Sequence, residues 1–304
     1  MTTFKEPLGG TELMFHELNR RLADSGHDFW AQISLFNYLP QADFTKKTVY
    51  WNQLSWDQPA VQFLKDRQMV EKIDHFVFVS HWQAEQFRRV FQIPGYKTWV
   101  LKNACLGVET PIDSPKERIK LCYTSTPWRG LEVLIRAWEI LNPSDCELHI
   151  FSSCQIYGPE FGQNDVVYQS LYDKCQTTPG IVYRGSIPNE DLRRELTSFD
   201  ILAYPCTFEE TSCISVIDAL SAGLRVVSSN LGALPETSEG WARLYPYLMD
   251  PETHAQRFSA VLNEEIHRLK AREWNSQDQV SHFQKYWSWD YRIQEWIQFL
   301  TRIL

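Results

Sequence analysis

Two acidic residues, Glu210 and Asp218, lie in a segment that runs from an apolar stretch through a loop into a short helix. The apolar stretch 200–204 predicts a strand, and the helix is expected from near Ser212 to Gly223, where a glycine C-cap is typical. Free N–H groups at a helix start suit a phosphate. Asp218, about two turns along, suits a vicinal diol such as ribose, and Glu210 suits sugar hydroxyls. The spacing predicts a nucleotide-sugar site, although acid pairs like this one also arise by chance.

A cation and a glycine, Arg129 and Gly130, directly precede a second predicted helix over 131–141. A guanidinium in this position is well placed to neutralise a diphosphate. The neighbouring hydroxyls of Ser125 and Thr126 could add hydrogen bonds. The alternative interpretation is an ordinary surface arginine.

The N-terminal part of the chain contributes further polar candidates. Gly9 and Gly10 precede a predicted helix, so their backbone could approach a phosphate or the bound sugar, the alternative being a simple loop. Asn52 and Gln53 follow a predicted strand, and either amide could hydrogen-bond the sugar donor or the acceptor, but neither accepts a proton at neutral pH. His81 begins another helix and is a candidate on the acceptor side, although a lone histidine is more often structural.

These candidates need elements to position them, and the chain alternates apolar strand-like runs with amphipathic helices. A linker around residues 111–115, rich in proline and short polar residues, separates two such series. Strands of the first series are expected at 27–36, 48–51, 73–80 and 98–102. Strands of the second are expected at 119–123, 147–151, 181–185, 200–204 and 223–230. Helices are expected at 13–23, from 57 onward, and at 81–91, 131–141, 189–199 and 286–300. The alternation predicts an α/β protein whose parallel sheets are covered by helices on both faces.

The composition is that of an ordinary globular protein of 304 residues, with 43% hydrophobic and 22% charged residues. Two domains are the natural expectation for this length. No apolar run reaches about 18 residues and the N-terminus lacks an apolar signal core, so neither a membrane span nor a signal peptide is expected. The net charge of −8 argues against general nucleic-acid binding. Seven cysteines without C-x-x-C spacing indicate reduced, mostly buried thiols in a cytoplasmic protein, without a zinc site.

The order of these motifs resembles that of retaining glycosyltransferases of the GT-B fold, family 4 in particular. Glu210 matches the first acid of the family's paired-acid motif and Asp218 the second, and the segment 231–236, which contains Gly232 and Glu236, resembles the family's Gly-x-x-Glu step. Weaker motifs at 101–104 and 183–188 fall in the expected order, so the resemblance covers nearly the whole chain. It implies two Rossmann-like parallel-sheet domains, the first of them reduced. The expected parts are an acceptor-side domain over 1–110, a domain that binds the nucleotide sugar over 116–280, and a helix over 281–304 that crosses back to the first domain.

The resemblance implies that a hexose moves from a nucleoside diphosphate sugar, UDP- or GDP-linked, to an acceptor hydroxyl of a glycan, a lipid-linked sugar or another acceptor, with retention at the anomeric carbon. The nucleotide sugar is a co-substrate, no other cofactor is expected, and no convincing Asp-x-Asp motif is present, so we expect metal independence. The catalytic candidates are Glu210 and Asn52. Ile187, by resemblance, borders the nucleobase. The residues expected to bind the sugar donor are Gly9, Gly10, Thr126, Arg129, Ile187, Glu210, Thr211, Ser212, Cys213, Ile214, Ser215 and Asp218.

The chain also departs from the family pattern. Only eight residues precede Gly9, so the usual first strand is expected to be missing. The residues 211–213 replace a Gly-Phe-Gly step, Asp218 is a shorter acid, and the amides at 52–53 replace a histidine. These departures keep open a non-catalytic nucleotide-sugar-binding protein or partner subunit, and a nucleotide-sugar epimerase is a second alternative. The basic-aromatic stretch 87–99 allows at most peripheral membrane contact, and a solvated helix face with its apolar side in the core is the favoured interpretation.

Overall fold

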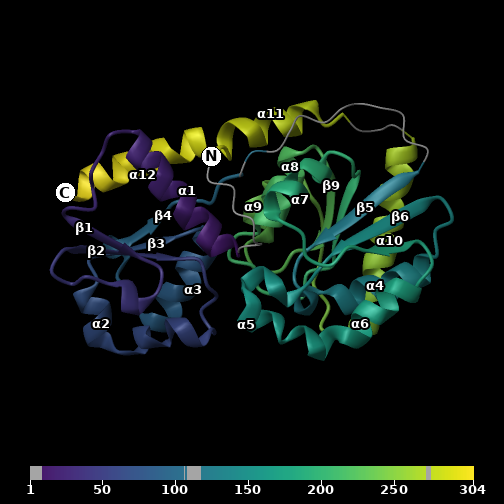
Figure 1. Cartoon of the computed structure of the whole chain (residues 1–304), viewed down its shortest axis with the longest axis horizontal. Helices are drawn as coiled ribbons and strands as arrows, with labels where there is room; N and C mark the ends of the chain where they lie inside the picture. Colours follow the sequence, from purple (N-terminus) through teal and green to yellow (C-terminus); the bar gives the residue numbers. More distant parts are fainter. Residues whose placement is uncertain (1–8, 106, 108–117, 272–274) are drawn as a thin grey trace.

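The computed structural model describes residues 9–105, 107, 118–271 and 275–304, and it shows two α/β units, each built on its own parallel sheet (Figure 1). The expected fold class, two parallel-sheet α/β domains, is therefore confirmed. Two sequence expectations fall outside the described residues: the missing strand before Gly9 and the linker around 111–115.

The N-terminal sheet has the strand order β1-β2-β3-β4, and every neighbouring pair is parallel. Its strands are β1 (Ile33–Phe36), β2 (Lys47–Asn52), β3 (His75–Phe78) and β4 (Thr98–Val100). The helices around it are α1 (Gly10–Asp24), α2 (Arg67–Lys72) and α3 (His81–Phe91), with short 3-10 helices η1 (Leu39–Gln41), η2 (Pro59–Lys65) and η3 (Gly95–Lys97).

Alternating side chains bury both faces of this sheet, as the two-residue period of a strand requires. Val77 packs into a cluster formed with α1 and the C-terminal helix α12 (Trp289–Ile303). Its neighbours Phe76 and Phe78 pack on the opposite face, in a cluster formed with α2 and α3. A sheet covered on both faces fixes the carboxyl ends of its strands, where the loops that face the second domain begin.

Helix α3 carries the basic-aromatic stretch of the sequence. Its Phe87 and Phe91 are buried in the core, whereas Arg88 and Arg89 lie on the surface and pair with Glu85. The structure therefore agrees with the favoured interpretation of a solvated helix face.

The C-terminal sheet has the strand order β10-β9-β8-β5-β6-β7, again with parallel neighbours throughout. Its strands are β5 (Ile119–Thr124), β6 (Cys146–Phe151), β7 (Ile181–Tyr183), β8 (Ile201–Tyr204), β9 (Arg225–Ser229) and β10 (Arg243–Tyr245). Its helices are α4 (Leu131–Leu141), α5 (Pro159–Gly162), α6 (Asp165–Thr177), α7 (Asn189–Leu196), α8 (Ile214–Ser221), α9 (Leu234–Ser238), α10 (Pro251–Lys270) and α11 (Gln277–Tyr286), with 3-10 helices η4 (Pro127–Arg129) and η5 (Cys154–Tyr157).

Gly130 brings α4 close to the end of β8. Its φ of +119° lies in a region that favours glycine, and a Cβ at this position would lie 2.1 Å from the carbonyl oxygen of Pro205. The absence of a side chain therefore lets the loop after β5 pack directly on the loop after β8. This contact brings Arg129 next to the acidic loop.

The C-terminal helices connect the two units (Figure 1). Helix α11 packs on α8 of the second unit, and α12 packs on α1 of the first. A single helix was expected over 286–300, but α11 ends at Tyr286 and α12 begins at Trp289. The Ser288 side chain accepts a hydrogen bond from the Tyr291 N–H and so caps the start of α12. Backbone contacts of Cys105 with Trp287 and Ser288 fix this break between the two units.

Several boundaries differ from the sequence expectations for local reasons. The strand expected at 27–36 is only Ile33–Phe36, because turn hydrogen bonds to the carbonyl of Phe29 occupy the preceding residues. The helix expected from 57 is the 3-10 helix η2, followed by α2 with an Asp66 cap. Helices α5, α6 and α10 and strand β10 were not predicted. All seven cysteines are buried and free, as expected.

Candidate functional site

A cavity of about 370 Å³ lies at the carboxyl ends of β5 and β8 and is lined by both units. From these neighbouring strands the chain moves in opposite directions along the sheet, from β5 to β6 and from β8 to β9. Ligands of open parallel sheets bind at such a reversal. The residues expected from the sequence around Arg129 and Glu210 lie at this point.

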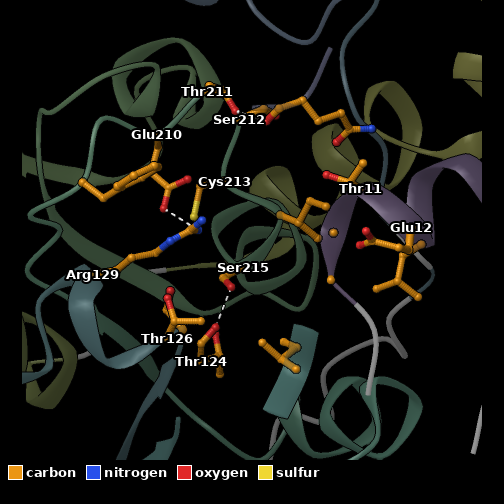
Figure 2. Close-up of a pocket in the computed structure, with 18 of the residues that line it drawn as sticks. Thr11, Glu12, Thr124, Thr126, Arg129, Glu210, Thr211, Ser212, Cys213 and Ser215 are labelled. Atoms are coloured by element: carbon orange, nitrogen blue, oxygen red, sulfur yellow. Dashed lines mark hydrogen bonds and ion pairs between the residues drawn. The ribbon is translucent and has the colours of Figure 1, made fainter. Parts of the chain in front are cut away.

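Arg129 and Glu210 form an ion pair in the cavity wall, with Nη1 of Arg129 at 3.0 Å from Oε1 of Glu210 (Figure 2). The Glu210 side chain is almost fully buried, whereas that of Arg129 is 23% exposed. The Arg129 guanidinium also lies over the Phe208 ring, 4.7 Å from its centre. The predicted cation and the predicted acid, 81 residues apart in the chain, are therefore partners.

The hydroxyl of Tyr204 donates a second hydrogen bond to the same oxygen, Oε1 of Glu210. Burial raises the pKa of the Tyr204 hydroxyl well above its usual value, so this group stays protonated and donates. Burial likewise raises the pKa of the nearby Cys213 thiol. Both contacts of the Glu210 carboxylate fall on Oε1, and they fix the orientation of the group.

The loop that carries Glu210 is held by the backbone of the segment 231–236. Gly232 has φ +64°, and a Cβ there would lie 2.5 Å from the carbonyl oxygen of Glu210. The Ala233 N–H donates to that carbonyl at 2.7 Å. The next side chain, Thr211, donates to the Gln53 carbonyl of the N-terminal unit at 2.9 Å. The acid loop is thus fixed by its own domain and by the facing one.

Helix α8 begins at the cavity. Its N-cap residue, Cys213, makes no side-chain cap, and the Ser215 hydroxyl donates to the Thr124 carbonyl at the end of β5. The helix therefore presents first-turn N–H groups toward the cavity wall, where an anion is favoured. One turn further on, the buried carboxylate of Asp218 lines the same cavity.

Two buried hydroxyls that line the cavity, Oγ1 of Thr126 and Oγ of Ser212, have no hydrogen-bond partner among the described residues. Leaving a buried polar group unpaired costs about 1–3 kcal/mol. Both hydroxyls belong to loops that flank the Arg129–Glu210 pair. Their arrangement fits a ligand whose oxygens would satisfy them, such as a phosphate or a sugar.

The N-terminal unit supplies the facing wall with the start of α1 and the loop after β2. Gly10 packs closely against Ile214 of α8, and a Cβ at position 10 would lie only 2.7 Å from Cδ1 of that side chain. Glu12 extends toward the cavity from the first turn of α1 (Figure 2). Gln53 also lines the cavity and accepts a hydrogen bond from Asn103 through its side-chain oxygen.

A third wall is largely apolar and comes from α7 and the segment after β6. Helix α7 turns one face toward the cavity, with residues three or four positions apart. The lining side chains of this wall are Ile156, Phe161, Asn189, Leu192, Arg193 and Leu196.

Most of the residues expected to bind the sugar donor line this one cavity: Gly9, Gly10, Thr126, Arg129, Glu210, Thr211, Ser212, Cys213, Ile214, Ser215 and Asp218. Three candidates, Asn52, Ile187 and His81, do not line it. Asn52 is fully buried, and its amide bonds the N–H and the carbonyl of Leu54, so it holds the turn after β2 instead. Ile187 packs against the core of the C-terminal unit.

The sequence interpretation missed several residues of the site. Tyr204 was placed in its strand but not beside Glu210, and a contact of this kind has no local sequence signal. Glu12 lies two residues after the Gly9-Gly10 step and could have been singled out on that ground. Arg193 is one of two consecutive arginines, and only the helix orientation shows which one faces the cavity.

Two further findings concern the described residues only. No group of three or more His, Cys, Asp or Glu side chains among them is arranged to hold a metal ion. No helix within the described ranges is long and apolar enough to cross a membrane.

Residues 119–264 match the protein family described as Glycosyl transferases group 1. Over 172 residues the chain is 26% identical to the O-antigen chain mannosyltransferase B of Escherichia coli, and over 199 residues it is 24% identical to the MMP alpha-(1->4)-mannosyltransferase of Mycolicibacterium hassiacum. These matches cover 52% and 60% of this chain, and each spans only 44% of the relative's length.

Solved structures resemble the fold over nearly the whole chain. Sucrose-phosphate synthase from Thermosynechococcus elongatus superimposes with a TM-score of 0.68 at 15% identity, covering 96% of this chain and 78% of the other. Anabaena HepE in complex with UDP and glucose gives a TM-score of 0.67 at 14% identity, covering 98% and 84%. Residues 119–264 thus resemble a glycosyl transferases group 1 domain, and the chain shares the two-domain fold of these solved structures.

Proposed function

We propose that the protein is a retaining glycosyltransferase of family 4 that moves a hexose from a nucleoside diphosphate sugar to an acceptor hydroxyl. The observation that carries the proposal is the Arg129–Glu210 pair in the cavity between the two units, at 3.0 Å. It is flanked by buried hydroxyls that find no hydrogen-bond partner within the described part of the chain. A cation, free hydroxyls and a helix start together suit a diphosphate, and a fixed carboxylate beside them suits a sugar.

The diphosphate would lie at the start of α8. The Arg129 guanidinium supplies positive charge, and the hydroxyls of Thr126 and Ser212 supply hydrogen-bond donors. First-turn N–H groups of the helix add donors of fixed direction. Asp218, further along the helix, would accept hydrogen bonds from the ribose hydroxyls. This set of donors can neutralise the leaving group without a metal ion, so we propose metal independence and no cofactor beyond the nucleotide sugar.

The sugar would lie beside Glu210. Because Arg129 and Tyr204 both bind Oε1, the second oxygen of the carboxylate remains for a hexose hydroxyl. A carboxylate at this position also favours positive charge at the anomeric carbon in the transition state. Bond formation and bond cleavage on the same face give retention, and the leaving phosphate oxygen takes the proton of the acceptor hydroxyl.

The names of the similar proteins suggest the first sugars to test. Two relatives are mannosyltransferases, and HepE was crystallised with UDP and glucose and with UDP-glucose. Mannose and glucose conjugates of UDP and GDP are therefore the first candidates. The seven buried free cysteines support a reducing, cytoplasmic setting.

The test begins with a thermal-shift screen against UDP, GDP, ADP and their hexose conjugates, because a ligand of the folded state raises the melting temperature. The conjugate that binds is then assayed for transfer to a panel of p-nitrophenyl hexosides, with and without EDTA. NMR of the product reports the anomeric configuration. We expect one base to be preferred, turnover unaffected by EDTA, and a retained anomeric configuration.

Glu210→Gln and Glu209→Gln form the matched pair of variants. Glu209 is exposed and its carboxylate contacts the Trp56 side chain, whereas Glu210 lies in the cavity wall. Loss of transfer in Glu210→Gln but not in Glu209→Gln supports the enzyme. Nucleotide binding without any transfer or hydrolysis would instead favour the non-catalytic alternative, and conversion of the free nucleotide sugar without an acceptor would favour an epimerase.

A further inference from the structure

Glu12 is the only charged side chain that the described part of the N-terminal unit places in the cavity wall. It lies in the first turn of α1, opposite the loops of the C-terminal unit, and points into the space between the two units (Figure 2). The other cavity-lining side chains from its unit are neutral: Thr11, Leu13, Tyr38, Gln53, Leu54, Ser55 and Gln58.

The Glu12 carboxylate is only partly buried and has no ion-pair partner among the described residues. Its own helix contrasts with it, because Glu17 pairs with Arg20 and Arg21 at 2.6 and 2.7 Å. Glu210, across the cavity, is likewise paired. Glu12 therefore faces the site as an acceptor of hydrogen bonds whose capacity is not used within the described protein.

We propose that Glu12 binds the acceptor, by receiving a hydrogen bond from a hydroxyl group of the acceptor beside the one that is glycosylated. The inference rests on the proposed function and assigns the acceptor side of the same cavity. A carboxylate accepts hydrogen bonds and donates none, so it suits a neutral hydroxyl and repels a diphosphate. The anionic end of the sugar donor is thus directed to Arg129 and α8, and the acceptor to α1.

In the reaction, the acceptor oxygen bonds to the anomeric carbon while the bond from that carbon to the diphosphate oxygen breaks. The hydroxyl proton passes to the leaving diphosphate oxygen, and Glu12 remains ionised throughout. Its contribution is to hold the acceptor so that the reacting hydroxyl lies next to the anomeric carbon, with its proton toward the leaving oxygen, and such positioning is a large part of catalysis in these transfers. Neither Asn52 nor Gln53 offers a carboxylate for this purpose.

A structural alternative has a different consequence. An acid in the first turn favours a helix through the helix dipole, by about 0.3–1 kcal/mol at an exposed site. If this were the whole role of Glu12, its removal would lower the stability of the protein and leave the kinetics with each substrate unchanged.

The experiment compares Glu12→Gln and Glu12→Ala with the wild type and with Asp24→Asn, a control at the exposed end of the same helix. The readouts are kcat and KM for the p-nitrophenyl hexoside that the wild type glycosylates best, Kd for the nucleoside diphosphate, and the midpoint of urea unfolding. We expect kcat/KM for the hexoside to fall by about tenfold or more in Glu12→Ala, as for loss of a charge-assisted hydrogen bond. The Kd is expected to stay within about twofold, and Asp24→Asn to match the wild type.

Three results overturn the inference. The first is unchanged transfer in both Glu12 variants. The second is a loss confined to nucleotide affinity, which would place Glu12 on the sugar-donor side, and the third is a loss confined to the unfolding midpoint. The proposed function itself fails if the wild type binds nucleotide but transfers no hexose to any hexoside or to water. Failure of the proposed function is thus distinguished from failure of the inference about Glu12.

Discussion

The carboxylate of Glu236, in the C-terminal unit, accepts a hydrogen bond at 3.0 Å from the backbone N–H of His81, the first residue of α3 in the N-terminal unit. Its second oxygen accepts from the Trp82 N–H at 3.1 Å. Glu236 thus caps a helix of the other unit, while Gly232, four residues earlier, supports the Glu210 loop. Another contact between the units, the ion pair of Lys102 with Glu239 at 3.0 Å, is made one turn of the chain further on.

Glu236→Gln is expected to weaken the closed arrangement of the two units. An acid at a helix start contributes about 0.3–1 kcal/mol, so affinity for the nucleotide sugar should fall about two- to fivefold. Small-angle scattering should show a larger radius of gyration without ligand. Glu85→Gln, on the exposed face of α3, is the control and should change neither value. An unchanged radius and affinity in Glu236→Gln would show that the cap does not hold the units together.

The sequence predicts an element well where its apolar residues face a core. Helix α4 begins and ends at the predicted residues, because Leu131, Leu134 and other apolar side chains along it are buried at helical spacing. Helix α6 was missed, since its Val166 and Val167 are exposed and obscure that spacing. Boundaries of both kinds of element differ from the prediction in places, such as the later start of β1 and the earlier start of α1, because tertiary contacts help decide where an element begins and ends.

The candidate site was predictable where its residues follow one strand, as they do from Glu210 to Asp218. Partners from distant segments were not predictable. The ion pair with Arg129 depends on the close packing of Gly130 on Pro205, and the sequence contains no local signal for that contact. The same reason explains why Asn52 was assigned to the site, since strand position alone does not show where a side chain finds its hydrogen bonds.

Gly232→Ala is expected to displace the Glu210 loop. The new Cβ would lie 2.5 and 2.6 Å from the backbone oxygen and nitrogen of Glu210, neither of which can move without moving the loop. Gly185→Ala is a matched control, because Gly185 has nearly the same φ, +65° against +64°, but open space around it. Both variants should lose about 1–2 kcal/mol of stability from the strained backbone.

Only Gly232→Ala should additionally lose nucleotide-sugar binding, as measured by isothermal calorimetry beside urea unfolding. Equal binding by the two alanine variants would show that the loop does not depend on this close contact.

Arg193→Ala is expected to weaken nucleotide binding, because Arg193 lines the cavity and has no ion-pair partner among the described residues. Other charges on α7 pair on its outer face, Arg194 with Glu190 and Asp191. Loss of a guanidinium contact to an anionic or polar ligand corresponds to about tenfold in Kd. Calorimetry with the preferred nucleoside diphosphate measures it, and Arg194→Ala, on the outer face, is the control. Similar affinities in the two variants would exclude a contact between Arg193 and the nucleotide.

A buried histidine outside the site predicts the response of the fold to acid. His254 is almost fully buried, and its Nε2 is hydrogen-bonded to the Tyr245 hydroxyl at 2.7 Å. Burial lowers the pKa of His254 to about 4, because it disfavours the charged ring. The unfolded chain, with a histidine pKa of about 6.5, therefore takes up a proton that the native protein does not. The contribution of His254 to the free energy of unfolding is fully present above about pH 6.5 and decreases as the pH falls toward about 4.

The free energy of unfolding is accordingly expected to decrease with acidification by at most about 1.4 kcal/mol per pH unit from His254 alone. His254→Gln should be less stable than the wild type near neutral pH but should lose less stability on acidification, since its side chain does not titrate. Urea unfolding at several pH values between about 7.5 and 4.5 measures both slopes. His27→Gln, at an exposed position, should keep the wild-type slope. A difference between the slopes of the two proteins requires that His254 is buried in its neutral form. If His254→Gln and the wild type lose stability in parallel, groups other than His254 control the acid response.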